Sequence, residues 1–535
     1  MKMTKYKLGE LVEVTRGASL SGQFYAEEGK LIRLTLGNFN MNGGGFKENT
    51  SKTDLYFTGT VRDEFILNKG DIITPLTEQS LGLLGTTARI PESGKYIQSQ
   101  DVALVRCKEG LLDPNFCYYL ISSSIVRQQL SAAAQQTKIR HTSPEKIKDC
   151  TIWVPDFYTQ KNIGRILTDI DNKIAINRRI NDNLEAMAKQ LYDYWFVQFD
   201  FPNEKGKPYK SNGGAMVWNE KLKREIPQGW SISNVKSLIE PIERGISYSS
   251  DDLLDPFATP MINLACFSKA GDYRLGEMKF FSGKVSNDKL ISPMDMLIAC
   301  TDMTQGADII GRPILASDEY DQYTFSTDLA LITPKGKFKM YLYYTLRTPF
   351  YHKYIRPFAS GTTVKHLNLI GVENYGLPVP PIEIQSKFED LITPIKEKQS
   401  KNLNEINALT KQRDELLPLL MNGQATVNYH LSASTYISFD ISVLFLNFTN
   451  GNSLYETISL DYQCFALSLH SKENTHGNIQ DDKRHIQQRQ RQGDKHARER
   501  FLAFFYKCTS TVHQAAFGNA WCYRGYKGKV ISESK

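Results

Sequence analysis

The sequence predicts an α+β protein made of two similar α/β globules, each followed by a long helix. Two observations support this prediction. Short runs recur at an offset of 225 residues: Ile-Arg-His at 139–141 returns as Val-Lys-His at 364–366, and Val-Pro with a following Gln at 154–160 returns at 379–385. After each Val-Pro, a polar helix pattern begins in the same register. A repeat of this kind indicates two copies of one structural unit.

The first copy is predicted to form a globule over residues 1–155. The apolar run Val-Ala-Leu-Val at 102–105 predicts a buried strand, and residues 115–130 have a helical pattern. Between the shared runs the two copies differ almost completely, above all at 22–60 and 250–285. One framework therefore supports two different variable surfaces.

A first spacer helix is predicted over residues 156–200. Apolar side chains recur there at alternating spacings of four and three residues, and two asparagines fall on the same stripe, which is a heptad pattern. The stripe consists of Ile163, Leu167, Ile170, Ile174, Asn177, Asn181, Leu184, Ala188, Leu191 and Trp195. Pro155 ends the preceding strand, and Pro202 lies beyond the helix.

Residues 201–225 are rich in Lys, Gly and Asn and predict a linker. The second globule is expected over 226–381 and the second spacer helix over 382–423, with Pro394 as a candidate kink. The stripe of this helix consists of Phe388, Ile392, Ile395, Gln399, Asn402, Ile406, Leu409, Arg413, Leu416 and Leu420. At 1.5 Å per residue, each helix of about 36 residues would be roughly 55 Å long.

Neither stripe is apolar enough to be stable alone in water. We therefore expect the two helices to pair as an antiparallel coiled coil within the chain. Asn177, Asn181, Gln399 and Asn402 would then be buried polar positions that set register and orientation. The alternative is two separate surface helices, each packed on its own globule.

The composition bounds the class of protein. A chain of 535 residues is too long for one hydrophobic core, and its net charge of +7 permits nucleic-acid binding without requiring it. The eight cysteines form no CxxC pair, so neither a zinc site nor a disulfide framework is predicted. No apolar run is long enough for a transmembrane helix, and a reducing cytoplasm fits best.

Motifs for catalysis are missing from the sequence. It has no GxxxxGK[ST] loop, no HExxH, no GxSxG and no GxGxxG opening a helix after a strand. It also lacks the Asn-Pro-Pro-Tyr tetrapeptide with which amino-methyltransferases hold a flipped base. We expect no catalytic residue, no metal site and no cofactor bound by the chain itself.

Polar loops before two strands are the strongest candidates for a binding surface. Hydroxyls and backbone N–H groups there can bind phosphates, Arg and Lys supply the opposite charge, and Gln or Thr can reach base edges. The candidate DNA-binding residues are Arg16, Ser19, Gln135, Thr137, Lys138, Arg140 and His141 in the first copy, and Arg244, Ser247, Thr362, Thr363, Lys365 and His366 in the second. A merely structural polar loop is the alternative, and for Arg16 and Arg244 a structural salt bridge is equally open.

Four runs in the second half add a resemblance. They are Ile-Pro-Gln-Gly-Trp at 226–230, Gly-Thr-Thr-Val-Lys-His-Leu-Asn at 361–368, Leu-Pro-Val-Pro-Pro-Ile-Glu-Ile-Gln at 377–385 and Leu-Leu-Pro-Leu-Leu-Met-Asn-Gly-Gln at 416–424. Each run is weak alone, but their order and the duplication are specific. Over about residues 1–427 the chain resembles the DNA-specificity subunit of type I restriction–modification systems.

This resemblance implies that each globule reads one half of a gapped, asymmetric DNA site and that the helices space the two readers. It also implies a non-catalytic subunit in a larger complex. Two methyltransferase subunits, docked on the helices, would bring S-adenosylmethionine, and two restriction subunits would bring ATP and Mg²⁺. The alternatives are a coiled-coil adaptor that binds only protein, without DNA reading, and a stand-alone nuclease or methyltransferase.

Two departures from the family pattern stand out. The first copy has Gln-Gln-Thr at 135–137 where the second has Gly-Thr-Thr at 361–363. The chain after Val427 lies outside the pattern, and the basic run at 483–500 is poor in apolar residues, so residues 424–535 are predicted to form an atypical, disordered extension.

Overall fold

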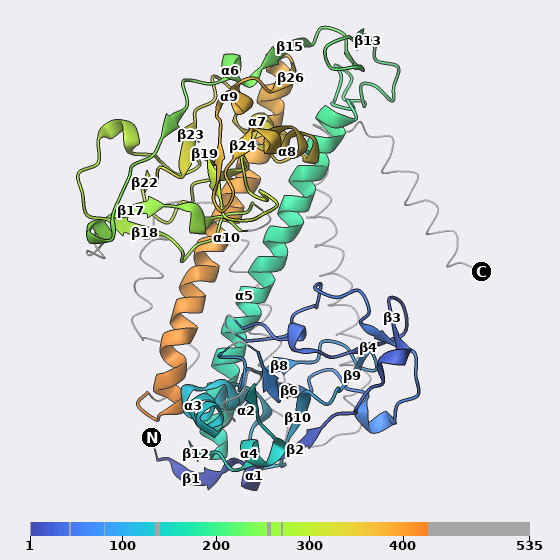
Figure 1. Cartoon of the computed structure of the whole chain (residues 1–535), viewed down its shortest axis with the longest axis vertical. Helices are drawn as coiled ribbons and strands as arrows, with labels where there is room; N and C mark the ends of the chain where they lie inside the picture. The colour runs from blue at the N-terminus through green and yellow to red at the C-terminus, as the bar shows by residue number, and fades with distance from the viewer. Residues whose placement is uncertain are drawn as a thin grey trace, which may run out of the picture.

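The computed structural model describes residues 2–41, 44–79, 81–133, 140–253, 258–268 and 271–425. It confirms the predicted fold class, because two α/β globules lie towards opposite ends of two long helices that run side by side (Figure 1). The extension predicted to be disordered lies, from residue 426 onward, outside the described residues.

A four-stranded sheet in the order β2-β10-β6-β8 is the framework of the first globule. Its strands are β2 (Val12–Arg16), β10 (Val102–Cys107), β6 (Ile72–Pro75) and β8 (Ala88–Arg89). The predicted strand at 102–105 is the buried part of β10. Beside this sheet lie the pair β1 (Thr4–Lys7) with β12 (Thr151–Val154) and a sheet of β3 (Tyr25–Ala26), β5 (Tyr56–Phe57), β4 (Leu31–Arg33) and β9 (Tyr96–Ile97).

The helices of this globule are α1 (Leu8–Leu11), α2 (Pro114–Ser122), α3 (Ser124–Ala133) and α4 (Pro144–Lys148). The helical pattern predicted at 115–130 is therefore confirmed, although the chain forms two helices there, which meet at Ser123. The backbone of Ser123 is extended, and its hydroxyl donates to the Leu120 carbonyl at 2.6 Å. The Ser123 hydroxyl thus takes the place of the backbone N–H group that the next turn of a continuous helix would have offered to the Leu120 carbonyl.

The second globule repeats this framework strand for strand. Its four-stranded sheet has the order β16-β23-β19-β21. The strands are β16 (Glu243–Arg244), β23 (Leu329–Ile332), β19 (Met296–Ala299) and β21 (Pro313–Leu315). Around them lie β15 (Ser231–Asn234) paired with β26 (Gly376–Val379), a sheet of β18 (Lys279–Phe281), β17 (Thr259–Ile262) and β22 (Thr324–Phe325), and the helices α6 (Val235–Leu238), α7 (Lys339–Thr345), α8 (Pro349–Ile355) and α9 (Ile370–Glu373).

The repeated Arg-Gly turn has the same cause in both copies. A Cβ atom on Gly17 would lie 2.3 Å from the carbonyl oxygen of Gln98, and one on Gly245 would lie 2.2 Å from that of Phe325. Two backbones pass too closely there for any side chain. The glycine is therefore repeated because both globules bring two backbone segments equally close together at this turn.

The two spacer helices are α5 (Phe157–Tyr192) and α10 (Ile382–Met421), and α10 is one helix that includes Pro394. The repeated glutamine fixes the entry to each. Gln160 Nε2 donates to the Pro155 carbonyl at 2.9 Å, and Gln385 Nε2 donates to the carbonyl of Pro380. The repeated Val-Pro followed by Gln is thus a device that joins a strand to a helix.

The helices pack antiparallel along their predicted stripes. Asn177 Nδ2 donates to Glu405 Oε2 at 2.7 Å, and the Asn181 carbonyl accepts from Gln399 Nε2 at 2.9 Å. Asn402 Nδ2 donates to Asn181 Oδ1 at 2.8 Å. Positions rise along α5 as their partners fall along α10, so the predicted polar layer and the orientation are confirmed.

Each end of the helix pair is built into a globule core. Leu420 and Met421, at the end of α10, pack in the first core with Phe116 and Ile163. Phe388 of α10 and Trp195, just beyond α5, are buried together in the second core, with ring centroids 5.7 Å apart. Because packed cores resist deformation, the helix pair fixes the separation of the globules.

The segment 201–225 differs from the expected linker. It carries a hairpin of β13 (Met216–Asn219) and β14 (Arg224–Pro227). Phe201 stacks on Tyr209, with ring centroids 4.7 Å apart, and contacts Trp230. Aromatic packing orders a stretch whose composition resembles a flexible connection. Within the described ranges, no helix combines the length and apolar content needed to cross a membrane.

Candidate nucleic-acid interface

Each globule presents a short β-ribbon that carries predicted recognition residues. In the first globule, β7 (Thr77–Glu78) pairs with β11 (Arg140–His141). In the second, β20 (Thr301–Asp302) pairs with β25 (Lys365–Leu367), which also pairs with β24 (Ala359–Ser360). The recurrent sequence runs thus become recurrent structural elements.

The register of the two ribbons is the same. His141 lies opposite Thr77, and His366 lies opposite Thr301. Next to each histidine, a basic residue faces an acid: Arg140 faces Glu78 and Lys365 faces Asp302. A ribbon of this size fits the major groove of DNA, where its side chains can reach base edges.

Glu78 organises the first ribbon. Its side chain is almost fully buried, and Oε2 accepts hydrogen bonds from the backbone N–H groups of Gly82, Leu83 and Leu84 at 3.1, 2.9 and 3.0 Å. Its other oxygen pairs with Arg140 at 3.1 Å. The Arg140 guanidinium also donates to the carbonyl of Ser131. Arg140 is therefore held within the protein, where we had expected a guanidinium directed at DNA.

Asp302 has the corresponding place in the second ribbon but a different partner set. It accepts from the N–H groups of Thr304 and Ile309 at 2.7 and 2.8 Å and forms no ion pair within 4.0 Å in the described part of the chain. Lys365 Nζ donates to the Gly361 carbonyl at 2.7 Å instead. The lysine thus closes the loop that presents Thr362 and Thr363.

Most of the other predicted residues are exposed. Ser19, His141, Ser247, Thr362, Thr363 and His366 all lie at the surface. Gln135, Thr137 and Lys138 lie outside the described residues. The structure thus assembles the predicted loop in the second copy, while for the first copy it places only the ribbon.

Arg16 and Arg244 end equivalent strands, β2 and β16. Neither forms a salt bridge within the described residues: Arg16 Nε donates to the Gln100 carbonyl at 2.9 Å, and Arg244 contacts the buried Cys300 thiol. Since Cys300 directly precedes β20, Arg244 lies beside the second ribbon. Arg16 acts electrostatically on Glu145, which follows His141 by four residues and so lies close to the first ribbon.

Sequence reasoning missed the two anchoring acids and their exposed neighbours. Leu81 and Met303, in the loops that Glu78 and Asp302 hold, are 75% and 73% exposed. The signal was present, because a Thr-acid dipeptide occurs at 77–78 and again at 301–302. Such a pair is too short to be noticed before the ribbons are seen.

The first globule is joined to the helix pair by a polar cluster of Tyr119, Asp171 and Arg413, here called the first relay. Tyr119 donates to Asp171 Oδ2 at 2.6 Å, and Arg413 Nη1 pairs with Asp171 Oδ1 at 2.9 Å. Arg413 also pairs with its neighbour Asp414 at 2.7 Å. One side chain from the globule and one from α10 therefore meet at a single carboxylate of α5.

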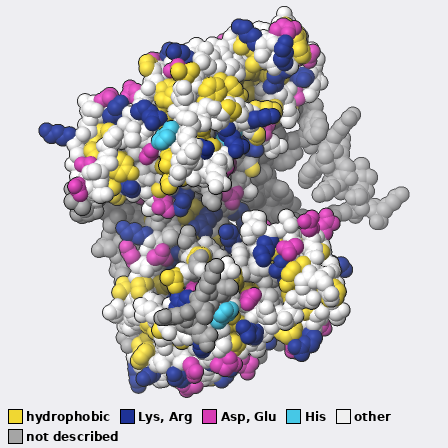
Figure 2. Space-filling model, in the orientation of Figure 1, with side chains coloured by type: hydrophobic (Ala, Val, Ile, Leu, Met, Phe, Trp, Pro, Cys, Tyr) yellow, Lys and Arg dark blue, Asp and Glu magenta, His cyan; other side chains and the backbone are white. Residues whose placement is uncertain are grey.

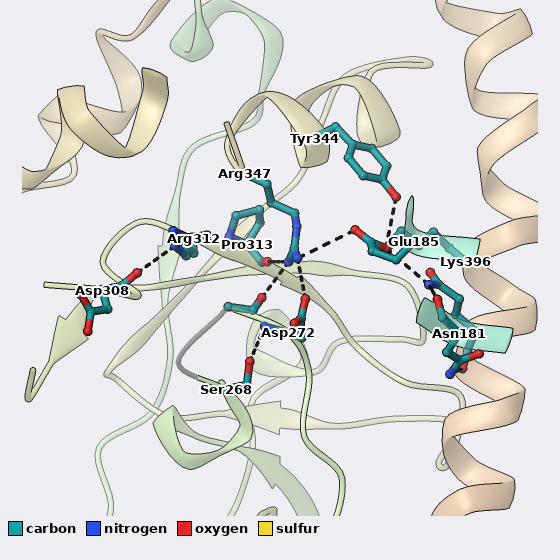
Figure 3. Close-up of polar contacts among 12 residues, drawn as sticks. Asn181, Glu185, Ser268, Asp272, Asp308, Arg312, Pro313, Tyr344, Arg347 and Lys396 are labelled. Carbon is teal, nitrogen blue, oxygen red and sulfur yellow. Dashed lines mark hydrogen bonds and ion pairs between the residues drawn. The ribbon is translucent and has the colours of Figure 1, made fainter. Parts of the chain in front are cut away.

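The second relay has the same plan with more charges (Figure 3). Tyr344 donates to Glu185 Oε2 at 3.4 Å, Lys396 pairs with the same oxygen, and Arg347 lies 3.8 Å from Oε1. Burial alone would raise the pKa of Glu185, but Lys396 and Arg347 outweigh it and hold this pKa below its ordinary value. Arg347 also pairs with Asp272, so the relay reaches into the globule.

Basic and acidic side chains are interspersed over both lobes of the face drawn in Figure 2, and each lobe shows a histidine with Lys or Arg nearby. This distribution agrees with the modest net charge of +7. Within the residues that the structure describes, no group of three or more His, Cys, Asp or Glu side chains is placed to hold a metal ion.

Comparison with known proteins identifies the family. The family described as "Type I restriction modification DNA specificity domain" matches residues 1–186 and 227–411. The chain is 24% identical over 329 residues to the type I restriction enzyme MjaIX specificity subunit of Methanocaldococcus jannaschii, covering 60% of this chain and 71% of that one. It is 21% identical over 385 residues to the HindI specificity subunit of Haemophilus influenzae, covering 62% and 81%.

A solved structure shows the same fold. The crystal structure of the type I restriction–modification S subunit from M. genitalium superposes with a TM-score of 0.52 at 17% identity, covering 79% of this chain and 96% of that chain. Each of the two family matches spans one globule and most of the helix that follows it. The relatives are named specificity subunits, in agreement with the non-catalytic role expected from the sequence. The matches cover more than half of the chain, which therefore belongs to the family of type I restriction–modification DNA specificity subunits.

Proposed function

We propose that the two globules read the two halves of one gapped, asymmetric DNA site and that the chain directs methyltransferase and restriction subunits to it. The observation that supports this most is the duplicated ribbon. Both copies carry an exposed histidine beside a basic residue, in the same register, on globules that one helix pair joins. A protein adaptor has no need for two such ribbons.

The length of the helices suits a gapped site. With 36 and 40 residues, α5 and α10 are roughly 54 and 60 Å long at 1.5 Å per residue. That span corresponds to about sixteen base pairs at 3.4 Å each. Readers at the two ends would address half-sites about one and a half helical turns apart, at about 34–36 Å per turn of the duplex.

The two half-sites should differ in sequence. The first ribbon holds its arginine against Glu78, whereas in the second no described cation pairs with Asp302, and Lys365 is joined to a Gly-Thr-Thr loop. Direct readout depends on which donors and acceptors reach the base edges. Unlike ribbons therefore favour unlike half-sites.

The outer face of α5 offers a surface for a partner protein. Ile176, Ile180 and Met187 are 52%, 38% and 55% exposed on this helix. Exposed apolar side chains that recur along one helix are typical of protein interfaces. We propose that two methyltransferase subunits, carrying S-adenosylmethionine, dock along the helices and that two restriction subunits bring ATP and Mg²⁺. Genomic DNA as the target makes the cytoplasm the proposed location.

A methylation map tests this proposal. The chain is expressed with its partner methyltransferase subunit in a host without DNA methylation, and modified bases are located by long-read sequencing. A single motif with two unlike halves and a fixed gap is the expected result. A chain ending at Val427 is the control, because a motif that appears only in this form would show that the extension inhibits the complex. No motif in either form would favour an adaptor that does not read DNA.

A further inference from the structure

A second basic surface lies in the second globule, outside the predicted recognition residues. It is a groove of about 710 Å³ between α8, the loop before β21 and the end of α5. Six basic side chains line it: Lys189, Arg312, Arg347, His352, Lys353 and Arg356. No carboxylate is among the lining residues.

The inner arginines of this groove are held by contacts within the protein. Figure 3 shows Arg347 between Glu185 and Asp272, and its Nη1 also donates to the Gly271 carbonyl at 2.7 Å. Arg312 Nε donates to the Asp308 carbonyl at 2.8 Å. These two arginines are therefore part of the protein's own structure.

The outer cations are not held in this way. Lys189, Lys353 and Arg356 are exposed, and none of them forms an ion pair within 4.0 Å in the part of the chain that the structure describes. Lys189 has Asp193 one turn further along the helix, and Asp308 acts electrostatically on His352 in the same groove. Like charges around one groove repel each other, so a bound anion would be stabilised by all three.

The equivalent groove of the first globule does not share this charge. It has a volume of about 330 Å³ and includes Ser124, Arg127, Gln128 and Ser131, which stand where the second copy has Pro349, His352, Lys353 and Arg356. It also includes the buried carboxylate of Glu78, and Arg127 is bound to the Gly82 carbonyl. The positive charge is thus not a consequence of the shared framework.

The groove adjoins the second recognition ribbon. Arg356 begins a short helical turn (Arg356–Phe358) that leads directly into β24, and β24 leads into the loop with Thr362 and Thr363. On its other side, the His352 ring donates from Nε2 to the Ala307 carbonyl at 3.0 Å, in the loop that Asp302 holds. An anion in the groove would therefore lie beside the bases that the ribbon reads.

We propose that this groove binds the DNA backbone next to the second half-site, with Lys189, Lys353 and Arg356 contacting the non-bridging oxygens of its phosphates. The inference rests on the proposed function. It adds that the two globules hold DNA unequally: the second supplies backbone affinity from this groove, while the equivalent groove of the first lacks these charges.

Salt dependence of DNA binding tests the proposal. The double variant Lys353→Gln/Arg356→Gln is compared with the unchanged chain, each assembled with the methyltransferase subunit. The probes are a duplex that carries the mapped motif and a duplex of equal length without it. Each lost phosphate contact reduces the slope of log affinity against log salt by about 0.9. We expect the slope to fall by about 2 on both duplexes and the affinity to fall about tenfold or more at low salt, with the same motif still methylated.

A matched control removes two positive charges elsewhere. Lys210→Gln/Lys221→Gln lies on the hairpin segment, where both lysines are exposed, and should leave the slope unchanged. An unchanged slope in the groove variant, with the motif still methylated, would overturn the inference and leave the proposed function intact. Weaker assembly with the methyltransferase at an unchanged slope would assign the groove to an acidic protein surface instead. Failure of the unchanged chain to give a motif would count against the proposed function itself.

Discussion

The two globules of this chain share a framework and differ in the charges attached to it. Four framework strands, the Arg-Gly turn, the Val-Pro and Gln helix entry and the Thr-acid ribbon occur in both. The first globule meets the helices through one carboxylate, Asp171, whereas the second uses Glu185 with Lys396 and Arg347. The shared framework determines where side chains lie, and under the proposed function the charges distinguish what each copy binds.

The charges also explain why the helices pair with each other. Asp171 and Lys396 occupy equivalent positions, 225 residues apart, and carry opposite charges. Each finds its partner, Arg413 or Glu185, only on the other helix. If α5 paired with a second α5, Asp171 would meet Ala188, and if α10 paired with a second α10, Lys396 would meet Thr410. Neither Ala188 nor Thr410 carries a charge. The charges of each helix are thus complementary to those of the other helix and not to those of a second copy of itself.

Removing one carboxylate from each relay should give the largest effect on stability. In Glu185→Gln, the buried Lys396 loses its carboxylate partner while Arg347 keeps Asp272, and because Glu185 is only partly buried we expect a loss of about 2–4 kcal/mol. In Asp171→Asn, Arg413 keeps Asp414, so a loss of about 1 kcal/mol is expected. Urea midpoints measured by circular dichroism give both values. Equal losses would show that the added charges of the second relay contribute nothing.

The exposed histidines should act on one half-site each. His366→Ala removes a side chain from the second ribbon alone, and a lost base contact costs about 1–3 kcal/mol, or roughly 5- to 150-fold in affinity. Competition binding with duplexes altered in one half measures this, and a methylation map shows whether only that half is relaxed. His141→Ala is the counterpart in the first ribbon. One variant that relaxes both halves would contradict modular reading.

Acid should weaken the second relay. Folding lowers the pKa of Glu185 below its ordinary value of 4.5, so its contribution is complete above that value and is lost as the pH falls through the lower value of the folded chain. The urea midpoint of the unchanged chain should therefore fall more between about pH 6 and pH 3.5 than that of Glu185→Gln. Parallel curves for the two proteins would mean that Glu185 does not titrate with folding.

An exposed ion pair between the same helices should matter least. Lys173 pairs with Glu405 at 3.3 Å, but the two side chains are 51% and 36% exposed. Solvent and salt screen such pairs, so Lys173→Ala should change the unfolding free energy by about 0.5 kcal/mol or less. The change should disappear in 1 M salt, where screening is nearly complete, with a Debye length of about 3 Å. A loss comparable to that of Glu185→Gln would show that burial is not what separates the two pairs.

The sequence predicted the repeat, the two helices and their polar layer, because spacing alone determines which helix positions face each other. Asn177, Asn181, Gln399 and Asn402 therefore lie where the heptads put them. The sequence could not predict that Arg140 would be bound by Glu78, because this contact joins strands 62 residues apart. It also misjudged the segment 201–225, where a few aromatic contacts order a polar stretch.

The basic groove could not be predicted from the sequence either, because its cations come from α5, the region of α8 and the loop before β21. No local pattern brings Lys189 next to Lys353 and Arg356. The short ribbon strands escaped for a different reason: two-residue strands carry too little periodicity to be recognised.

One rigid helix pair is proposed to set the distance between two different DNA readers. The most direct test inserts seven residues into each helix at the same level, after Lys173 in α5 and before Glu405 in α10, where these residues pair. Seven residues preserve the stripe and lengthen each helix by about 10 Å. The methylation map of this variant should show both half-sites unchanged and the gap wider by about three base pairs. An unchanged gap would contradict the account.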